Sequence, residues 1–217
     1  MKFIGELHNV KLINFSVDLQ EVLPMVPQSL KVFQENGIAI ISMVDVQLKN
    51  MRPTWLPFFK FGYRHVAFRL LLDDSRFNKI EPKGIYFLKS FSNRPLMNWV
   101  GNLISNYKLT NGKIKEIYDA FSLKQMGKYV DYALDPFSEV NEDNALYQKI
   151  HRIDRAYATE DNGIFVTKIA RKHWPIEPVK CYHFATNFFK SAKLLGAFKV
   201  KDVIHYTWNE PKKVISF

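Results

Sequence analysis

Three polar side chains alternate along one predicted strand in the first third of the chain. In residues 63–72, "YRHVAFRLLL", Tyr63, His65 and Arg69 stand at odd positions. Because successive side chains of a strand point to opposite faces, these three share one face and Arg64 points to the other. A phenol, an imidazole and a guanidinium on one face could line a ligand pocket. They could equally form the solvent face of an edge strand, and the sequence leaves both interpretations open.

Two further arginines are candidates for holding an anion. Arg94 stands at the start of a predicted helix, where a guanidinium and the helix N-terminus together favour a carboxylate. The alternative is an exposed arginine in a capping region, which is the favoured interpretation. Arg155 follows Asp154 in a predicted strand. It could reach inward to bind an anion, but a structural ion pair with a nearby acid is favoured.

The segment "RKHWPIEPV" (residues 171–179) combines a histidine, a tryptophan and two prolines. The prolines remove backbone donors and stiffen the chain, so the segment is typical of a corner between two strands. We expect Trp174 to anchor that corner. His173 has no carboxylate or nucleophile at a spacing that implies a catalytic dyad. A structural corner is therefore favoured over an active-site histidine.

Several classes of site are excluded or disfavoured by composition. A single cysteine permits neither an intramolecular disulfide nor a cysteine-based zinc site. The histidines show no His-x-x-x-His or Glu-x-x-His spacing, and the chain has no Gly-rich phosphate loop and no Gly-x-Ser-x-Gly motif. We therefore expect no metal site and no cofactor.

The net charge of +10 invites a nucleic-acid interpretation. The lysines and arginines are spread along the whole chain, however, and no nucleic-acid-binding motif accompanies them. Binding of nucleic acid is thus disfavoured, whereas a small anionic ligand fits the charge. No apolar run approaches the ~20 residues that span a bilayer, and Glu6 and His8 interrupt any signal-peptide core at the N-terminus. We expect a cytoplasmic protein without membrane association. The oligomeric state stays open, and a homo-oligomer is compatible with the sequence.

Alternating and β-branched segments dominate the chain and predict nine or ten strands. The apolar run "GIAIISMVDV" (37–46) is one of them, and residues 152–174 contain the clearest hairpin. One strong helix is predicted over Asn93–Tyr107, with short helices near 18–27 and 142–151 and a helical patch near 191–195. No linker or repeat divides the chain. We expect a single mostly β (α+β) domain, residues 1–217, in which one main helix packs on a curved antiparallel sheet or partial barrel.

Three segments in order resemble an uncharacterised bacterial family with the fold of acetoacetate decarboxylase. They are "LPMVPQSLKVFQENGIAIISMVDVQLKNMRP" (23–53), "GIYFLKSFSNRPLMNWVGNLISNY" (84–107) and "IDRAYATEDNGIFVTKIARKHWPIEPV" (153–179). The resemblance spans roughly residues 17–184. It implies an acetoacetate decarboxylase-like fold with a ligand pocket.

The resemblance also implies a chemistry to test. Acetoacetate decarboxylase forms a Schiff base through a lysine whose pKa a neighbouring lysine lowers. Lys108 stands closest to that lysine here, but Leu109 replaces the second lysine and Asn106 replaces a glycine. A surface lysine after a helix is the favoured interpretation of Lys108, and a Schiff-base nucleophile is the alternative.

Two functions follow from these observations. The first is a small-molecule-binding protein whose barrel pocket holds a carboxylate or keto acid with an apolar body. Its charge would be held by one of three arginines, Arg94, Arg155 or Arg64. Its pocket would include Tyr63, His65, Tyr107 and Trp174. The alternative is a decarboxylase-type lyase that acts through Lys108.

Overall fold

The computed structural model describes residues 2–78, 84–95, 97, 109–138, 140, 144–160, 163–172 and 174–216. It is 64% strand and 8% helix, so the mostly β fold predicted from the sequence is confirmed. The described residues contain fifteen strands, a larger number than the sequence predicts. The excess comes from short strands such as β2 (Gln34–Glu35) and β6 (Leu109–Asn111), which are too brief to show alternation.

The other strands follow the chain in order. They are β1 (Phe3–Asp18), β3 (Ile38–Pro53), β4 (Phe61–Leu71), β5 (Gly84–Ser92), β7 (Lys113–Ile117), β8 (Ala120–Gln125), β9 (Lys128–Asp135), β10 (Arg155–Glu160), β11 (Gly163–Arg171), β12 (Ile176–Thr186), β13 (Lys193–Val200), β14 (Ile204–Trp208) and β15 (Lys212–Ser216). The helices are α1 (Leu19–Val22), the 3₁₀ helix η1 (Leu23–Met25) and α3 (Asn144–His151). The short helices predicted near 18–27 and 142–151 are therefore present, whereas the helical patch predicted near 191–195 is wrong, because β13 begins at Lys193.

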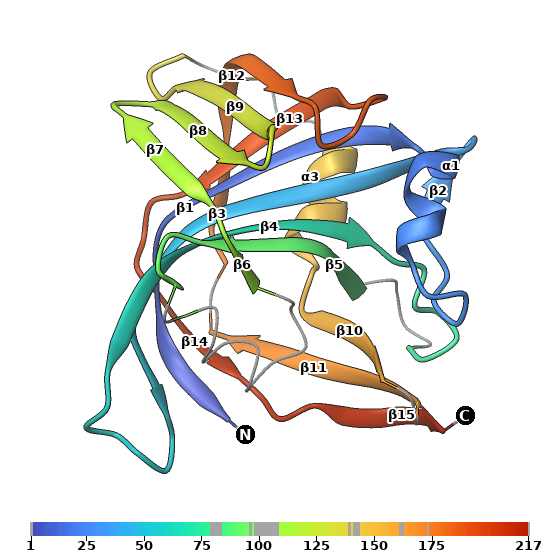
Figure 1. The fold of residues 1–217 in the computed structure, drawn as a ribbon, viewed down its shortest axis with the longest axis vertical. Helices are drawn as coiled ribbons and strands as arrows, with labels where there is room; N and C mark the ends of the chain where they lie inside the picture. Colours follow the sequence, from blue (N-terminus) through green and yellow to red (C-terminus); the bar gives the residue numbers. More distant parts are fainter. Residues whose placement is uncertain are drawn as a thin grey trace.

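Seven strands close into a barrel in the order β3-β4-β5-β10-β11-β14-β1, with β1 pairing back to β3 (Figure 1). All these pairs are antiparallel except β5 with β10. One parallel pair is a geometric necessity, because seven strands cannot alternate in direction around a closed ring. The partial barrel expected from the sequence is thus a complete one.

Strand β1 belongs to the barrel and to a second sheet. Its first half pairs with β14 and its second half with β13, and its pairing with β3 shifts register between His8 and Lys11. Asn9 lies inside that shift with φ 50°, and Asn50 has φ 52° near the register shift of β3. Asparagine tolerates this left-handed conformation, so these residues let two long strands bend.

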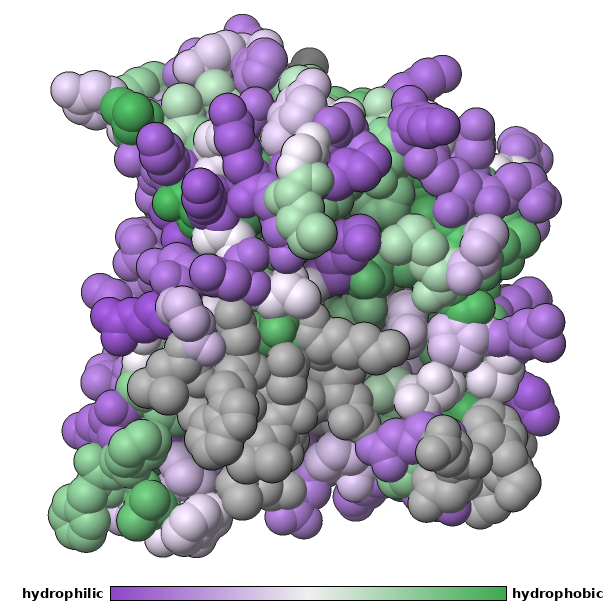
Figure 2. Space-filling model, in the orientation of Figure 1, coloured by the Kyte–Doolittle hydropathy of each residue, from purple (hydrophilic) through white to green (hydrophobic). Residues whose placement is uncertain are grey.

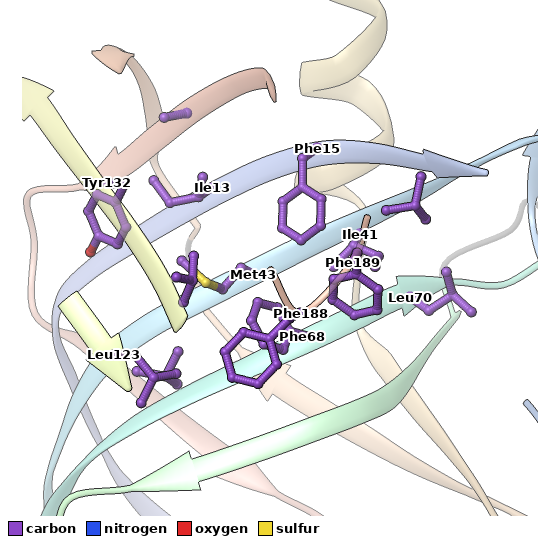
Figure 3. Close-up of a cluster of buried hydrophobic side chains, with 14 of the residues drawn as sticks. Ile13, Phe15, Ile41, Met43, Phe68, Leu70, Leu123, Tyr132, Phe188 and Phe189 are labelled. Carbon is purple, nitrogen blue, oxygen red and sulfur yellow. The ribbon is translucent and has the colours of Figure 1, made fainter. Parts of the chain in front are cut away.

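The second sheet, β13-β12-β9-β8-β7, packs over the outer face of β1, β3 and β4 (Figure 1). The core between the two layers is aromatic and aliphatic (Figure 3), with Phe15, Met43, Phe68, Leu123 and Phe189 all fully buried. Side chains of alternate parity on the same barrel strands point into the barrel and form a second apolar cluster. The run at residues 37–46 lacks regular polar alternation because both faces of β3 are buried, and its two polar residues, Ser42 and Asp45, are buried as well.

Strand β3 continues to Pro53, which pairs with Phe3, so the tip of the β3–β4 hairpin begins at Thr54. The predicted helix Asn93–Tyr107 lies almost entirely outside the described residues. Within the described residues, no helix is long and apolar enough to cross a membrane.

Candidate functional site

A cavity of about 150 Å³ lies inside the barrel. An apolar protein cavity of that size can hold a benzene-sized molecule. Its walls come from the inner faces of β1, β3, β4, β5, β11 and β14, and most of them are apolar. The apolar walls are Phe3, Leu7, Val10, Val44, Val46, Leu48, Met51, Phe61, Ile85, Phe87, Met97, Ile169 and Trp208.

Arg69 is a buried guanidinium in the wall of this cavity, with 8% of the residue exposed. Its Nε donates to the backbone oxygen of Ser42 at 3.1 Å and its Nη2 donates to the Ser42 hydroxyl at 2.8 Å. No carboxylate of the described residues lies within ion-pair distance of it. Burial, together with repulsion from Arg171, lowers the pKa of Arg69 to about 9. The site therefore holds a positive charge that no acidic side chain in the described residues neutralises through an ion pair.

Arg171 is the second cation of the cavity and ends β11. Its Nη2 donates to the backbone oxygen of Ile153, and its guanidinium lies 4.3 Å from the centre of the Trp174 ring. Burial lowers the pKa of Arg171 to about 10, although the charge of Asp154 opposes that shift. Stacking on an indole fixes the guanidinium plane while its remaining N–H groups stay available.

Neutral polar groups complete the lining. Burial, followed by the charge of Arg69, lowers the pKa of His65 to about 4, so its imidazole is neutral near pH 7. Burial also raises the pKa of Tyr63 and Tyr206 above the ordinary range of a phenol. Both hydroxyls consequently stay protonated. That of Tyr206 already donates to Met51 Sδ at 2.9 Å, whereas that of Tyr63 can donate to a ligand.

The described lining contains no aspartate, glutamate, lysine, cysteine or serine. It can therefore bind and orient an anion, but the described part of it supplies no lysine that could form a Schiff base. Across the described residues, no three His, Cys, Asp or Glu side chains gather closely enough to hold a metal ion.

The structure brings together three of the residues predicted for the site. Tyr63 and His65 line the cavity from β4, and Trp174 lines it from the segment that follows β11. Tyr107 and Lys108 lie outside the described residues, as does His173. Trp174 packs against the inner apolar cluster, as expected of a corner residue.

Arg94 and Arg155 lie elsewhere. Arg94 is exposed, and its backbone N–H donates to the Ser92 hydroxyl at 3.2 Å. Arg155 donates from Nε to Asp154 at 2.6 Å and lies 3.9 Å from Asp74, so the ion pair favoured for it is present. Neither arginine lines the cavity.

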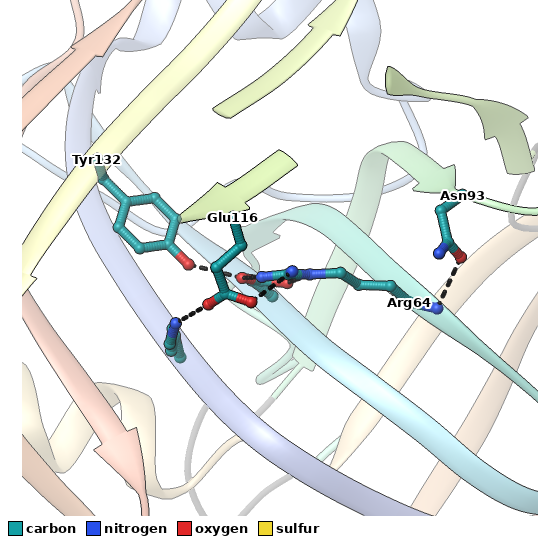
Figure 4. Close-up of polar contacts among 6 residues, drawn as sticks. Arg64, Asn93, Glu116 and Tyr132 are labelled. Atoms are coloured by element: carbon teal, nitrogen blue, oxygen red, sulfur yellow. Dashed lines mark hydrogen bonds and ion pairs between the residues drawn. The ribbon is translucent and has the colours of Figure 1, made fainter. Parts of the chain in front are cut away.

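Arg64 points away from the cavity into a buried charge network (Figure 4). Its Nε and Nη2 donate to the two oxygens of Asp45 at 2.7 and 2.6 Å, and its Nη1 donates to Glu116 at 2.7 Å. Tyr132 donates to Asp45 at 2.6 Å, and Lys11 pairs with Glu116. This arginine is already neutralised, so it has no free charge for a ligand.

Sequence reasoning overlooked Arg171 as a site residue and left Arg69 out of the predicted set. The signal for Arg69 was its place on the same strand face as Tyr63 and His65. The signal for Arg171 was weaker: it stands two residues after Ile169, so both point inward from one strand.

Comparison with known proteins fits this architecture. Residues 5–209 match the family DUF2071, described as an "Uncharacterized conserved protein". The chain belongs to this family. No curated protein matches the sequence.

Solved structures resemble the fold at low sequence identity. An acetoacetate decarboxylase from Legionella pneumophila superposes with a TM-score of 0.64 at 10% identity, over 100% of this chain and 88% of that one. The enduracididine biosynthesis enzyme MppR with HEPES bound gives 0.60 at 12% identity, over 98% and 86%. MppR complexed with pyruvate gives 0.59 at 12%, over 99% and 90%. This DUF2071 member therefore has an acetoacetate decarboxylase-like fold.

Proposed function

We propose that the barrel cavity binds a small carboxylate or keto acid with an apolar body. The observation that carries this proposal is the pair Arg69 and Arg171, one buried and one half-buried guanidinium that face an apolar cavity without an ion-pair partner among the described residues. Holding such charges in an apolar interior is costly, and an anion between them removes that cost.

The cavity lining also suggests how such a ligand would lie. The carboxylate would accept charge-assisted hydrogen bonds from the two guanidiniums. The hydroxyl of Tyr63 or the imidazole of His65 would donate to a keto oxygen. The apolar remainder would lie against walls such as Leu48 and Phe87. A second carboxylate would find no cation in the described lining, which favours monocarboxylates.

This proposal assigns the charge to different arginines from those expected on sequence grounds. Arg64 and Arg155 are paired with acids, and Arg94 is exposed at the surface. Support for the ligand class comes from a structural neighbour, because MppR forms a complex with pyruvate, a small keto acid. A cytoplasmic location and the single-domain organisation stay predictions from the sequence.

The test is calorimetric titration with pyruvate, phenylpyruvate and hexanoate, with hexanamide as the uncharged control. We expect acids to bind and the amide not to bind. Arg69→Met and Arg171→Met should each weaken binding at least about tenfold, because each removes a hydrogen bond to a charged group. The matched control is Arg76→Met, which removes an exposed arginine outside the cavity. Unchanged affinity in a variant that carries both Arg69→Met and Arg171→Met would contradict the proposal. An equal loss of affinity in the Arg76→Met control would contradict it as well.

A decarboxylase-type lyase is the alternative, and its predicted nucleophile Lys108 lies outside the described residues. Borohydride trapping with the same keto acids separates the two functions. A reduced adduct at Lys108, lost in Lys108→Arg, would identify a Schiff-base enzyme. Binding without an adduct would identify a ligand-binding protein.

A further inference from the structure

We propose that the tip of the β3–β4 hairpin, residues 54–60, docks on an anionic lipid surface. The tip sequence "TWLPFFK" exposes large apolar side chains: Trp55 is 64% exposed, Phe58 93% and Phe59 54%, and Leu56 is also exposed. Figure 2 shows hydrophobic side chains gathered at the lower left of the molecule, where Figure 1 places this hairpin beyond the barrel wall. Isolated exposed apolar residues are ordinary, whereas a contiguous protruding set of this kind marks an interaction site.

The tip has a defined shape that holds these rings outward. The Leu56 N–H donates to the Pro53 oxygen at 3.1 Å, and the Phe59 N–H donates to the Leu56 oxygen at 3.2 Å. The Thr54 N–H donates to Lys2 at 3.1 Å, which fastens the tip to β1. Little conformational entropy is therefore left to lose when the tip binds.

The charge around the tip favours an anionic surface. Residues 46–63, which contain the tip and the strand ends beside it, include three basic residues, Lys49, Arg52 and Lys60, and no aspartate or glutamate. Lys60 is the last residue of the tip and is exposed, and Lys2 is exposed beside Thr54. Lys49 is exposed on β3, five residues before the tip. Glu6 pairs across the strands with Lys49 and is hydrogen-bonded to His8 and Asn50. Aromatic rings at the interface with lysines beside them are the pattern of peripheral membrane anchors.

A second exposed apolar patch has acidic instead of basic neighbours and serves as a comparison. On the second sheet, Tyr118 is 94% and Phe137 93% exposed, but Asp119 and Asp135 border them. Those carboxylates would be repelled by anionic lipid. Exposure is thus similar in the two patches, and only the hairpin tip adds the charge that a lipid surface requires. Association of the tip with a second copy is disfavoured by the net charge of +10 on each chain.

The experiment is co-sedimentation of the full chain with vesicles of phosphatidylcholine alone and of phosphatidylcholine with phosphatidylglycerol. We expect binding to the anionic vesicles and weak or no binding to the neutral ones. Combined substitution of Trp55, Phe58 and Phe59 by serine should weaken binding at least about tenfold, since each ring loses its apolar burial. Lys49→Gln and Lys60→Gln should each weaken it about fivefold. The control Tyr118→Ser with Phe137→Ser should bind as the unmodified chain does.

Insertion of the hairpin tip into the lipid is measured by the fluorescence of Trp55. Its fluorescence should shift to the blue and be quenched by brominated lipid, and Trp55→Phe should abolish the quenching that arises at the tip while it preserves sedimentation. The idea is overturned if the anionic vesicles bind nothing, or if the triple variant sediments as before. It is also overturned if the triple variant changes the molar mass in light scattering without changing vesicle binding, because the tip would then join two copies.

Discussion

His65 is the residue whose environment gives the clearest pH prediction. The folded-state pKa of about 4 lies below the ordinary 6.5, because burial and Arg69 disfavour the imidazolium. Between these values the unfolded chain binds a proton at His65 and the folded protein does not. The neutral imidazole of His65 therefore makes its full contribution to the free energy of unfolding above pH 6.5, and this contribution is lost as the pH falls towards 4.

The variant His65→Phe removes this titration and keeps a ring in the cavity wall. We expect the stability of the variant relative to the unmodified protein to rise by the order of 3 kcal/mol between pH 6.5 and 4. Urea unfolding of both proteins across this range measures the difference, and carboxylates that titrate in both proteins cancel. A difference that does not change with pH would contradict the predicted environment of His65.

Single residues also show where sequence reasoning ends. Alternation placed Tyr63, His65 and Arg69 on one face of a strand, and the structure agrees. Whether that face met solvent or a cavity depended on barrel closure between β1 and β3, which is a long-range pairing. No local pattern near His65 encodes that pairing, so the sequence left both interpretations open.

At the scale of elements, the barrel and the second sheet are joined by the network around Asp45. This carboxylate is fully buried on β3, and it accepts from Arg64 on β4 and Tyr132 on β9. Burial tends to raise the pKa of Glu116 on β7, but hydrogen bonds from Lys11 and Arg64 lower it overall. Charged hydrogen bonds thus link β1, β3 and β4 of the barrel with β7 and β9 of the second sheet.

Removal of one partner of Asp45 should lower the free energy of unfolding. We expect Arg64→Met to lower the free energy of unfolding by about 3–5 kcal/mol, because Asp45 would remain charged and buried. Tyr132→Phe should cost about 1–3 kcal/mol, since it removes one hydrogen bond to the same carboxylate. Urea unfolding measures both. The double variant Asp45→Leu with Arg64→Met should be less destabilised than Arg64→Met alone, and an additive loss would show that the pair is not coupled.

The elements that the sequence predicted well are those with local signals. Period-two alternation located most strands, and Asn-Gly at 162–163 marked the hairpin of β10 and β11. The parallel pairing of β5 with β10 could not be predicted, because the two strands are joined by a long intervening stretch that carries other strands and α3. The assignment of Arg64 to an ion pair depended on the same long-range topology.

At the scale of the whole molecule, the charge of +10 has two separate consequences. Cations at the hairpin tip face solvent, whereas Arg69 and Arg171 lie inside the barrel. Salt screens exposed charges strongly and buried ones much less, because the Debye length shrinks in the solvent and not in the protein interior. Ionic strength can therefore separate binding at the surface from binding in the cavity.

The final prediction uses this difference. Between 50 and 200 mM salt, we expect the affinity for a small carboxylate to change by less than about threefold, because Arg69 is buried and Arg171 is half-buried, and salt screens such charges less than exposed ones. Binding to anionic vesicles should weaken markedly over the same range. A protein that contacts nucleic acid through 6–10 phosphates would lose about 10³–10⁵ in affinity. Calorimetry with the carboxylate, sedimentation with vesicles and fluorescence anisotropy with an oligonucleotide measure the three dependences. A steep salt dependence for the carboxylate would place its charge contact at the surface and not at Arg69 and Arg171.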